Sequence, residues 1–339
     1  MIKHALRAAV AAAALTALVG AVAQQSEAPT GFDDLSNGMV DDSTHHADQD
    51  SFDEVETVDD GLVEAVADST LLALAREQRR ATHGKIHGQA VRVPIVEAPG
   101  TTGVGRFGWK DQQASLLSFS GDAYLNEMGI TSRLFPDEVT TLCNTAPEPN
   151  NTPDSTGLED IDRFARFMRA TKAPARDTIL ARTQSAKAGS ALFDKIGCAT
   201  CHVRTLTTAA AGTAINGGAF TIPPALGDKT FHPFGDFLLH NVGTGDGIVM
   251  AMPEHYGRRV YQVKWKDLSL DSIARTQNKV RTAPLWGVRL HPRLMHDQAS
   301  LTLRDAIVRH GGEASEVTVR FRRLSPRQQQ TIIAFLRSL

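Results

Sequence analysis

The feature that most constrains this chain is a run of five residues, Cys198-Ala199-Thr200-Cys201-His202. C-x-x-C-H is the pattern that attaches c-type haem: two thiols at this spacing bond the two vinyl groups, and the next residue becomes the proximal ligand of the iron. We therefore expect haem c, attached through Cys198 and Cys201, with His202 on the iron. Residues 186–196 have the apolar spacing of a helix that leads into the motif.

Other uses of a C-x-x-C pair fit the sequence less well. A thioredoxin-like pair belongs in a βαβ pattern, which the neighbouring sequence lacks, and it would leave His202 without a role. A structural zinc site needs more Cys or nearby His ligands than a chain with three cysteines offers. A disulfide between Cys198 and Cys201 is the remaining alternative, and so short a loop would strain it.

The N-terminus has the features of a secretory signal peptide over residues 1–23. Lys3 and Arg7 precede an apolar run, Ala8–Gly20, and Ala21-Val22-Ala23 is an A-x-A cleavage signal. We expect cleavage near Ala23 and a periplasmic or secreted protein without a membrane span; an uncleaved anchor is the alternative. Export agrees with the motif, because c-type haem is attached outside the cytoplasm.

Charge is distributed unevenly along the chain. Residues 24–60 hold twelve Asp and Glu and no Lys or Arg, whereas residues 61–339 carry 34 basic and 26 acidic side chains, a net charge of +8. The acidic segment has too few apolar residues to offset its ordering entropy, which predicts a mostly disordered tail. The net positive charge of residues 61–339 is favourable for binding an acidic redox partner. No nucleic-acid-binding signature accompanies it, so we expect no nucleic-acid partner.

The apolar pattern predicts a mainly α fold with long ordered loops. Apolar side chains recur at helical spacing in 158–168 and near the C-terminus, where Ser325 is a candidate N-cap and Pro326 fits the first helical position. Gly, Thr and Ala dominate 203–230, which predicts a loop.

The segment around the motif, Phe193–Arg204, resembles the di-haem oxidoreductase family, which is related to the bacterial di-haem cytochrome c peroxidases. The resemblance covers about residues 50–339, and its motifs are specific in combination. They are 61–70 (GLVEAVADST), 105–110 (GRFGWK), 127–131 (EMGIT), 232–240 (HPFGDFLLH), 280–287 (VRTAPLWG), 294–297 (LMHD) and 309–314 (RHGGEA).

One departure from the family concerns the number of haem groups. Members carry two C-x-x-C-H sites, whereas this sequence has one. Residues 53–62 look like the sequence that leads into the first haem module, and the next residues look like the segment that lies directly after that module. We therefore expect the module to be missing, with its flanks joined near Gly61 and Leu62, and one haem in place of two. The resemblance implies a remnant N-terminal or linking region at 61–184 and a cytochrome c-like haem domain at 185–339.

The sixth iron ligand is open among several histidines and methionines. The candidates are His240, His255, His291, His296, His310, Met128, Met250, Met252 and Met295. In the related peroxidases an axial Met lies about one helix after a His-Asp-Gly segment, and His310 occupies that place here. The resemblance therefore implies His310 as the distal ligand of a low-potential bis-His haem. Met295 is the alternative, followed by an empty position.

The same resemblance suggests further residues of a haem pocket. Arg281 is a candidate partner of a haem propionate, with a surface ion pair as the alternative. Trp286 could line the haem edge, although large aromatic residues more often belong to the core. His296 is expected in the pocket wall. Gln298 stands where relatives have Gly, which predicts an altered turn, and no catalytic residue can be assigned.

Three functions remain open for such a chain. The first is an exported c-type haem protein that transfers electrons to or from a small cytochrome or copper protein. The second is a peroxidase-like oxidoreductase, which needs an open coordination site and usually a second haem. The third is a degenerate member with a structural or partner-binding role, whose uncovered surface could bind a partner or a second copy of the chain.

Overall fold

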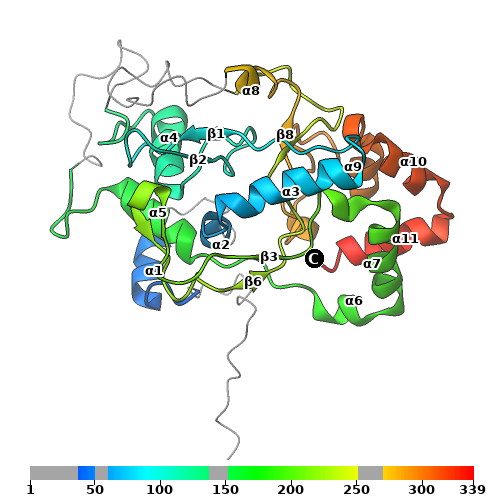
Figure 1. Cartoon of the computed structure of the whole chain (residues 1–339). Helices are drawn as coiled ribbons and strands as arrows, with labels where there is room; N and C mark the ends of the chain where they lie inside the picture. The colour runs from blue at the N-terminus through cyan, green and yellow to red at the C-terminus, as the bar shows by residue number, and fades with distance from the viewer. Residues whose placement is uncertain (1–36, 50–59, 137–151, 251–269) are drawn as a thin grey trace, which may run out of the picture.

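The computed structural model describes residues 37–49, 60–136, 152–250 and 270–339, and the chain is mainly helical there (Figure 1). The helices are α1 (Asp42–Gln49), α2 (Asp60–Glu64), α3 (Asp68–Ala81), α4 (Leu116–Met128), α5 (Asp160–Ala170), α6 (Thr178–Arg182), α7 (Gln184–Ile196), α8 (Leu270–Ala274), α9 (Leu303–Arg309), α10 (Ser315–Arg323) and α11 (Pro326–Leu336). None of them combines the length and apolar character that a membrane crossing requires.

The strands are short and pair only in twos. They are β1 (Arg92–Pro94), β2 (Thr102–Val104), β3 (Leu206–Thr207), β4 (Ala214–Ile215), β5 (Phe220–Thr221), β6 (Thr230–Phe231), β7 (Leu239–His240) and β8 (Val280–Arg281). The antiparallel pairs are β1 with β2, β3 with β6, β4 with β5, and β7 with β8. In the last pair His240 lies opposite Val280, which joins two distant loop segments.

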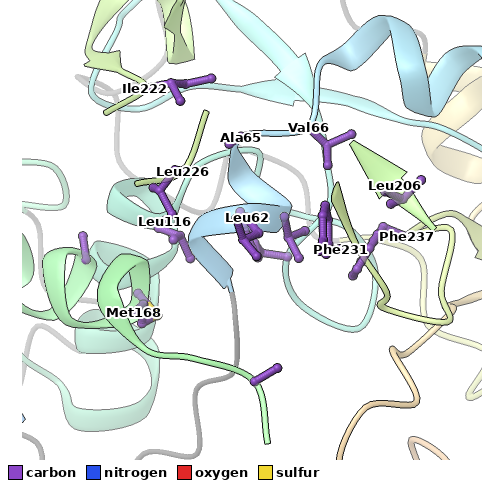
Figure 2. Packing of buried hydrophobic residues seen from close by; sticks show 14 of the residues in the cluster. Leu62, Ala65, Val66, Leu116, Met168, Leu206, Ile222, Leu226, Phe231 and Phe237 are labelled. Carbon is purple, nitrogen blue, oxygen red and sulfur yellow. The ribbon is translucent and has the colours of Figure 1, made fainter. Parts of the chain in front are cut away.

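The larger core surrounds the short helix α2. Leu62 is buried between Leu116 of α4 on one side and Phe231 and Phe237 on the other (Figure 2). This core therefore combines residues from both sides of position 185. The predicted module junction near Gly61 falls inside α2, where a Cβ on Gly61 would lie 2.4 Å from the carbonyl oxygen of Arg169.

A buried ion pair fixes α2 against its neighbours. Glu64 accepts hydrogen bonds from Arg169 of α5 (Nε, 2.6 Å), from the backbone of Leu116 (2.8 Å) and from Asn216 (2.9 Å). Burial alone would raise the pKa of Glu64, but Arg169 and these donors outweigh it and lower the pKa. A charge with this many partners holds three segments in one arrangement.

Part of the acidic segment that composition predicts to be disordered is helical. Helix α1 packs against α5, its His45 ring stacks on Phe167 at 5.3 Å, and Asn37 donates to the backbone of Arg169. Residues 24–36 and 50–59 of that segment lie outside the described residues, as do residues 1–23 and Cys143.

The second core is built on the crossing of α7 and α11. Phe193 of α7 and Phe335 of α11 meet edge to face with ring centres 5.3 Å apart. Helix α11 begins as predicted, with Ser325 as N-cap in a capping box and Pro326 in the first turn. At the crossing point Gly189 has no room for a side chain, because a Cβ there would lie 1.8 Å from the carbonyl oxygen of Thr331.

Replacing Gly189 by Ala is therefore expected to destabilise the protein although alanine favours helices. Forcing the two backbones apart costs about 2–3 kcal/mol, more than the ~1 kcal/mol that Ala gains in helix propensity. Chemical denaturation measures the loss, and Ala188→Ser on the exposed face of α7 serves as control. An unchanged midpoint for Gly189→Ala would mean that the helices do not cross this closely.

Candidate functional site

A cavity of about 370 Å³ lies beside the Cys-x-x-Cys-His turn. Its walls come from α7, α9, α10, α11 and the segment 280–298, and most are apolar, including Phe193, Leu294 and Phe321. The described residues that line it include two arginines and five histidines but no Asp or Glu. Such walls suit a large apolar cofactor with a few polar anchoring points.

The two cysteines lie on the wall of this cavity. Helix α7 ends at Gly197, whose φ of +102° lets the chain turn at once into the 3-10 turn Cys198–Thr200. Both thiols are free of a disulfide. Burial raises the pKa of Cys198 to about 12, and it also raises the pKa of Cys201, against the opposing effect of His240. A reactive redox dithiol needs a lowered thiol pKa, so these thiols do not fit a thioredoxin-like role.

His202 and His310 face each other across the cavity. Their ring centres are 6.4 Å apart, with an angle of 58° between the planes. His202 Nδ1 donates to the carbonyl oxygen of Phe234 (2.9 Å), and His310 Nδ1 donates to that of Ala306 (2.7 Å). These bonds leave each Nε2 as a free lone pair, the arrangement by which proteins orient a ligating imidazole.

Burial keeps both imidazoles neutral. It lowers the pKa of His202 to about 4, with a smaller contribution from nearby His310, and it also lowers the pKa of His310. A neutral imidazole is the form that binds a metal ion, so both histidines are in the ligand form at neutral pH.

Arg281 lines the cavity on the side of β8. Its Nε donates to the carbonyl oxygen of Gly108 (3.0 Å) and lies 3.9 Å from Asp111. Asp111 is fully buried, neither of its oxygens has a hydrogen-bond partner among the described residues, and burial raises its pKa well above the usual value. Arg281 is thus a partly buried cation beside a carboxyl group that is easily neutralised.

Met295 and His296 lie on the loop that closes one side of the cavity. His296 packs edge to face against Trp109 with ring centres 6.0 Å apart. Arg309, next to His310, anchors this loop through an ion pair with Asp297 and a hydrogen bond to Ser300 (2.8 Å). All three expected residues of this region, His310, Met295 and His296, therefore line the same cavity.

The turn at Gln298 has a strained backbone. Its φ is +53°, in the left-handed region that glycine adopts without steric cost. We expect Gln298→Gly to stabilise the protein by up to about 1 kcal/mol, because relief of strain exceeds the entropy that glycine loses. Thermal denaturation measures the change. Gln298→Ala keeps the strain and is the control, so an equal gain in both variants would count against this explanation.

Several candidates do not reach the cavity. Trp286 is packed in the larger core against Phe231, with ring centres 6.1 Å apart, and does not line the cavity, so its expected place at the haem edge is not found. Met250 is buried in a separate cluster, and Met128 is 53% exposed. Residues His255 and Met252 lie outside the described residues.

A buried polar cluster beside Cys201 was not predicted from the sequence as a unit. His240 contacts Asp236, Glu313 and the Cys201 sulfur. Gln78 of α3 also donates to Asp236 and to the carbonyl oxygen of Thr200 (2.9 Å), so the cluster fixes the turn that carries the cysteines. His240 and Asp236 lie in the motif 232–240, Cys201 in 198–202 and Glu313 in 309–314, and no local pattern shows that these motifs meet.

Paired thiols, neutral imidazoles and apolar walls together define a haem-binding class of site. The comparisons identify its family: the model described as "Di-haem oxidoreductase, putative peroxidase" matches residues 52–339, and the chain belongs to this family. No curated protein matches the chain. Among solved structures it is similar to the hydrazine synthase of Kuenenia stuttgartiensis studied under 20 bar of xenon, with 20% identity and a TM-score of 0.31. That match covers 53% of this chain and 55% of the other, about half of its length.

Proposed function

We propose that this protein is an exported c-type haem protein that transfers electrons through one haem. Cys198 and Cys201 would hold the haem covalently, with His202 and His310 as the axial ligands. The observation that carries the proposal is the pair of neutral imidazoles facing each other beside two free thiols in an apolar cavity. Haem bound there supplies reversible one-electron chemistry.

The distance between the imidazoles supports a single metal ion between them. A metal–nitrogen distance of about 2.0–2.1 Å on each side, plus about 1.1 Å from nitrogen to ring centre, gives a separation of about 6.3 Å. The ring centres of His202 and His310 are 6.4 Å apart. No comparable distance supports Met295, which remains the alternative ligand.

The chain's own residues would position and shield the group. Phe234 and Ala306 orient the two imidazoles through their carbonyl oxygens. Apolar walls surround the two histidines, and Arg281 offers a cation for a propionate. The crossing of α7 and α11 directly before the cysteine motif supports a cytochrome c-like domain over 185–339.

The remaining features fit a soluble redox carrier outside the cytoplasm. The signal peptide of residues 1–23 supports a periplasmic or secreted location, and the basic body supports an acidic small cytochrome or copper protein as partner. The family's description favours peroxidase-like chemistry as the second candidate. Two features oppose that candidate here: both axial positions have a histidine within reach, and the described lining contains no carboxylate for acid–base work.

Absorption spectra of the exported, matured protein test the proposal. We expect one haem per chain, low-spin when oxidised and when reduced, and unchanged by hydrogen peroxide. A high-spin band that changes when peroxide is added would favour the peroxidase function instead.

A further inference from the structure

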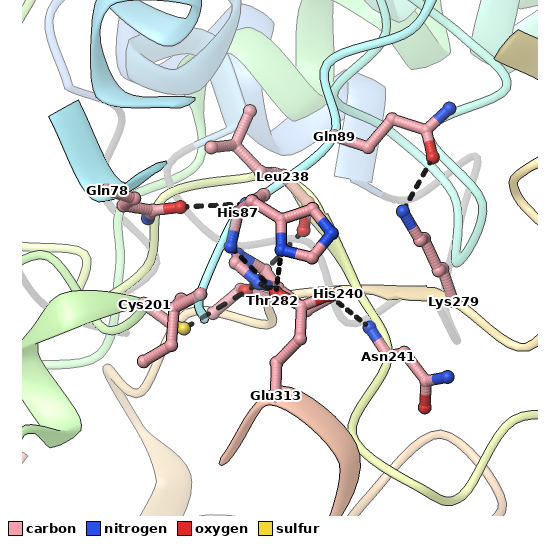
Figure 3. Close-up of polar contacts among 12 residues, drawn as sticks. Gln78, His87, Gln89, Cys201, Leu238, His240, Asn241, Lys279, Thr282 and Glu313 are labelled. Carbon is pink, nitrogen blue, oxygen red and sulfur yellow. Dashed lines mark hydrogen bonds and ion pairs between the residues drawn. The ribbon is translucent and has the colours of Figure 1, made fainter. Parts of the chain in front are cut away.

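The buried cluster around His240 is not used by the proposed haem attachment. His240 Nε2 lies 3.0 Å from Asp236 Oδ2, and its Nδ1 lies 3.0 Å from Glu313 Oε2 (Figure 3). Ionised carboxylates only accept hydrogen bonds, so His240 carries a proton on both ring nitrogens when Asp236 and Glu313 are both ionised. The side chain is 2% exposed, yet it lines the cavity and lies 3.8 Å from the Cys201 sulfur.

The exposed side chain of His87 lies between the cluster and solvent. Glu313 Oε2 accepts a hydrogen bond from the backbone of His87 (2.9 Å), and His87 Nδ1 lies 4.0 Å from the same oxygen. The side chain of His87 is 47% exposed, against 8% for Glu313. Figure 3 shows His87, Glu313 and His240 close together beside Cys201. These contacts therefore connect a half-exposed histidine to a buried imidazole on the cavity wall through one carboxylate.

We propose that His240, held between Asp236 and Glu313, is a proton-binding site whose occupancy is coupled to reduction of the haem. The inference rests on the proposed function. When a redox partner delivers one electron to the cavity, the added negative charge favours the imidazolium over the neutral imidazole. A proton that His240 has lost to water at high pH then returns from water through Glu313, and oxidation releases it again, so charge balances in both directions.

The charges around His240 set the pH range of this coupling. The titratable groups that face it are Asp236 before β7, Glu313, and Cys201 after the 3-10 turn. His202, His87 and Asp111 lie further away. Burial alone would lower the pKa of His240, but Asp236 and the other negative neighbours hold it well above the usual value. The neutral thiol, or the thioether that replaces it, adds little, so we attribute this mainly to the carboxylates.

The direction of the effect follows from these signs. Below the pKa of His240 in the oxidised protein the group is protonated in both redox states, and the midpoint potential does not depend on pH. Between that value and the higher pKa of the reduced protein, reduction takes up a proton, because the extra electron raises the pKa of His240. The midpoint potential should then fall as pH rises above neutrality, with a slope that approaches one proton per electron.

Redox titration between about pH 6 and about pH 10 tests the proposal on haem-loaded protein. We expect this alkaline slope in the wild type, and we expect its loss in His240→Gln and its weakening in Glu313→Gln, which also serves if His240→Gln does not fold. His83→Gln removes an exposed histidine outside the cluster and should keep the slope. Direct measurement of proton uptake on reduction at alkaline pH should agree.

Two results would overturn the proposal. One is a midpoint potential that does not depend on pH in the wild type. The other is an unchanged slope in both cluster variants, which would point to the haem propionates. Failure of the proposed function is distinguishable, because it appears beforehand as absence of the absorption bands of covalently bound haem.

Discussion

Replacing both Cys198 and Cys201 by alanine is expected to abolish covalently bound haem. The structure has these two thiols on the wall of one cavity, free of a disulfide, at the end of α7. Without either sulfur no thioether can form, so any haem that enters the cavity is held by its axial ligands alone and is lost on denaturation. Haem staining of a denaturing gel should fall from one haem per chain to background.

Single variants and a third cysteine make this test specific. Cys198→Ala and Cys201→Ala should each retain part of the covalent haem through the remaining sulfur. Cys143→Ala, outside the described residues, should keep the full amount. Persistence of covalent haem in the double variant would refute the assigned attachment site.

Replacing His310 by alanine is expected to change the iron from low-spin to high-spin. The variant removes the imidazole that lies 6.4 Å from His202 and leaves an open position in the cavity. Loss of a strong nitrogen ligand should also raise the midpoint potential, and added imidazole should restore the low-spin spectrum. Absorption and electron paramagnetic resonance spectra of the oxidised protein measure the change.

Met295→Ala is the matched control for His310→Ala. Both residues line the cavity, but the proposed ligation predicts that Met295→Ala stays low-spin. The reverse pattern, with a low-spin His310→Ala and a high-spin Met295→Ala, would make Met295 the ligand. The high-spin His310 variant also offers a test of peroxide reactivity, since it opens the position that a peroxidase needs.

Local signals in the sequence were sufficient for several elements. The capping box at Ser325 and the amphipathic pattern of 158–168 predict α11 and α5, because caps and helical periodicity depend on neighbouring residues. The C-x-x-C-H pattern is equally local. The resemblance to the family, and not a local pattern, implies His310 as the distal ligand. In the structure its ring centre lies 6.4 Å from that of His202.

Other features depend on contacts that no local pattern records. His240 and Glu313 are 73 residues apart, and their segments are joined by backbone hydrogen bonds from Gly311 to Val242 and from Glu313 to Asn241. Trp286 is packed in the larger core, where its ring lies against Phe231, and it does not line the cavity. The sequence does not predict that position 189 must be glycine either. Glycine is required there only because α11 crosses α7 at this residue.

Intact mass spectrometry of the exported wild-type protein under denaturing conditions tests the central proposal most directly. The predicted result is one species whose mass equals the chain from about Gln24 onward plus one covalent haem. A mass without haem, or with two haem groups, would contradict the proposal of a single c-type haem on Cys198 and Cys201.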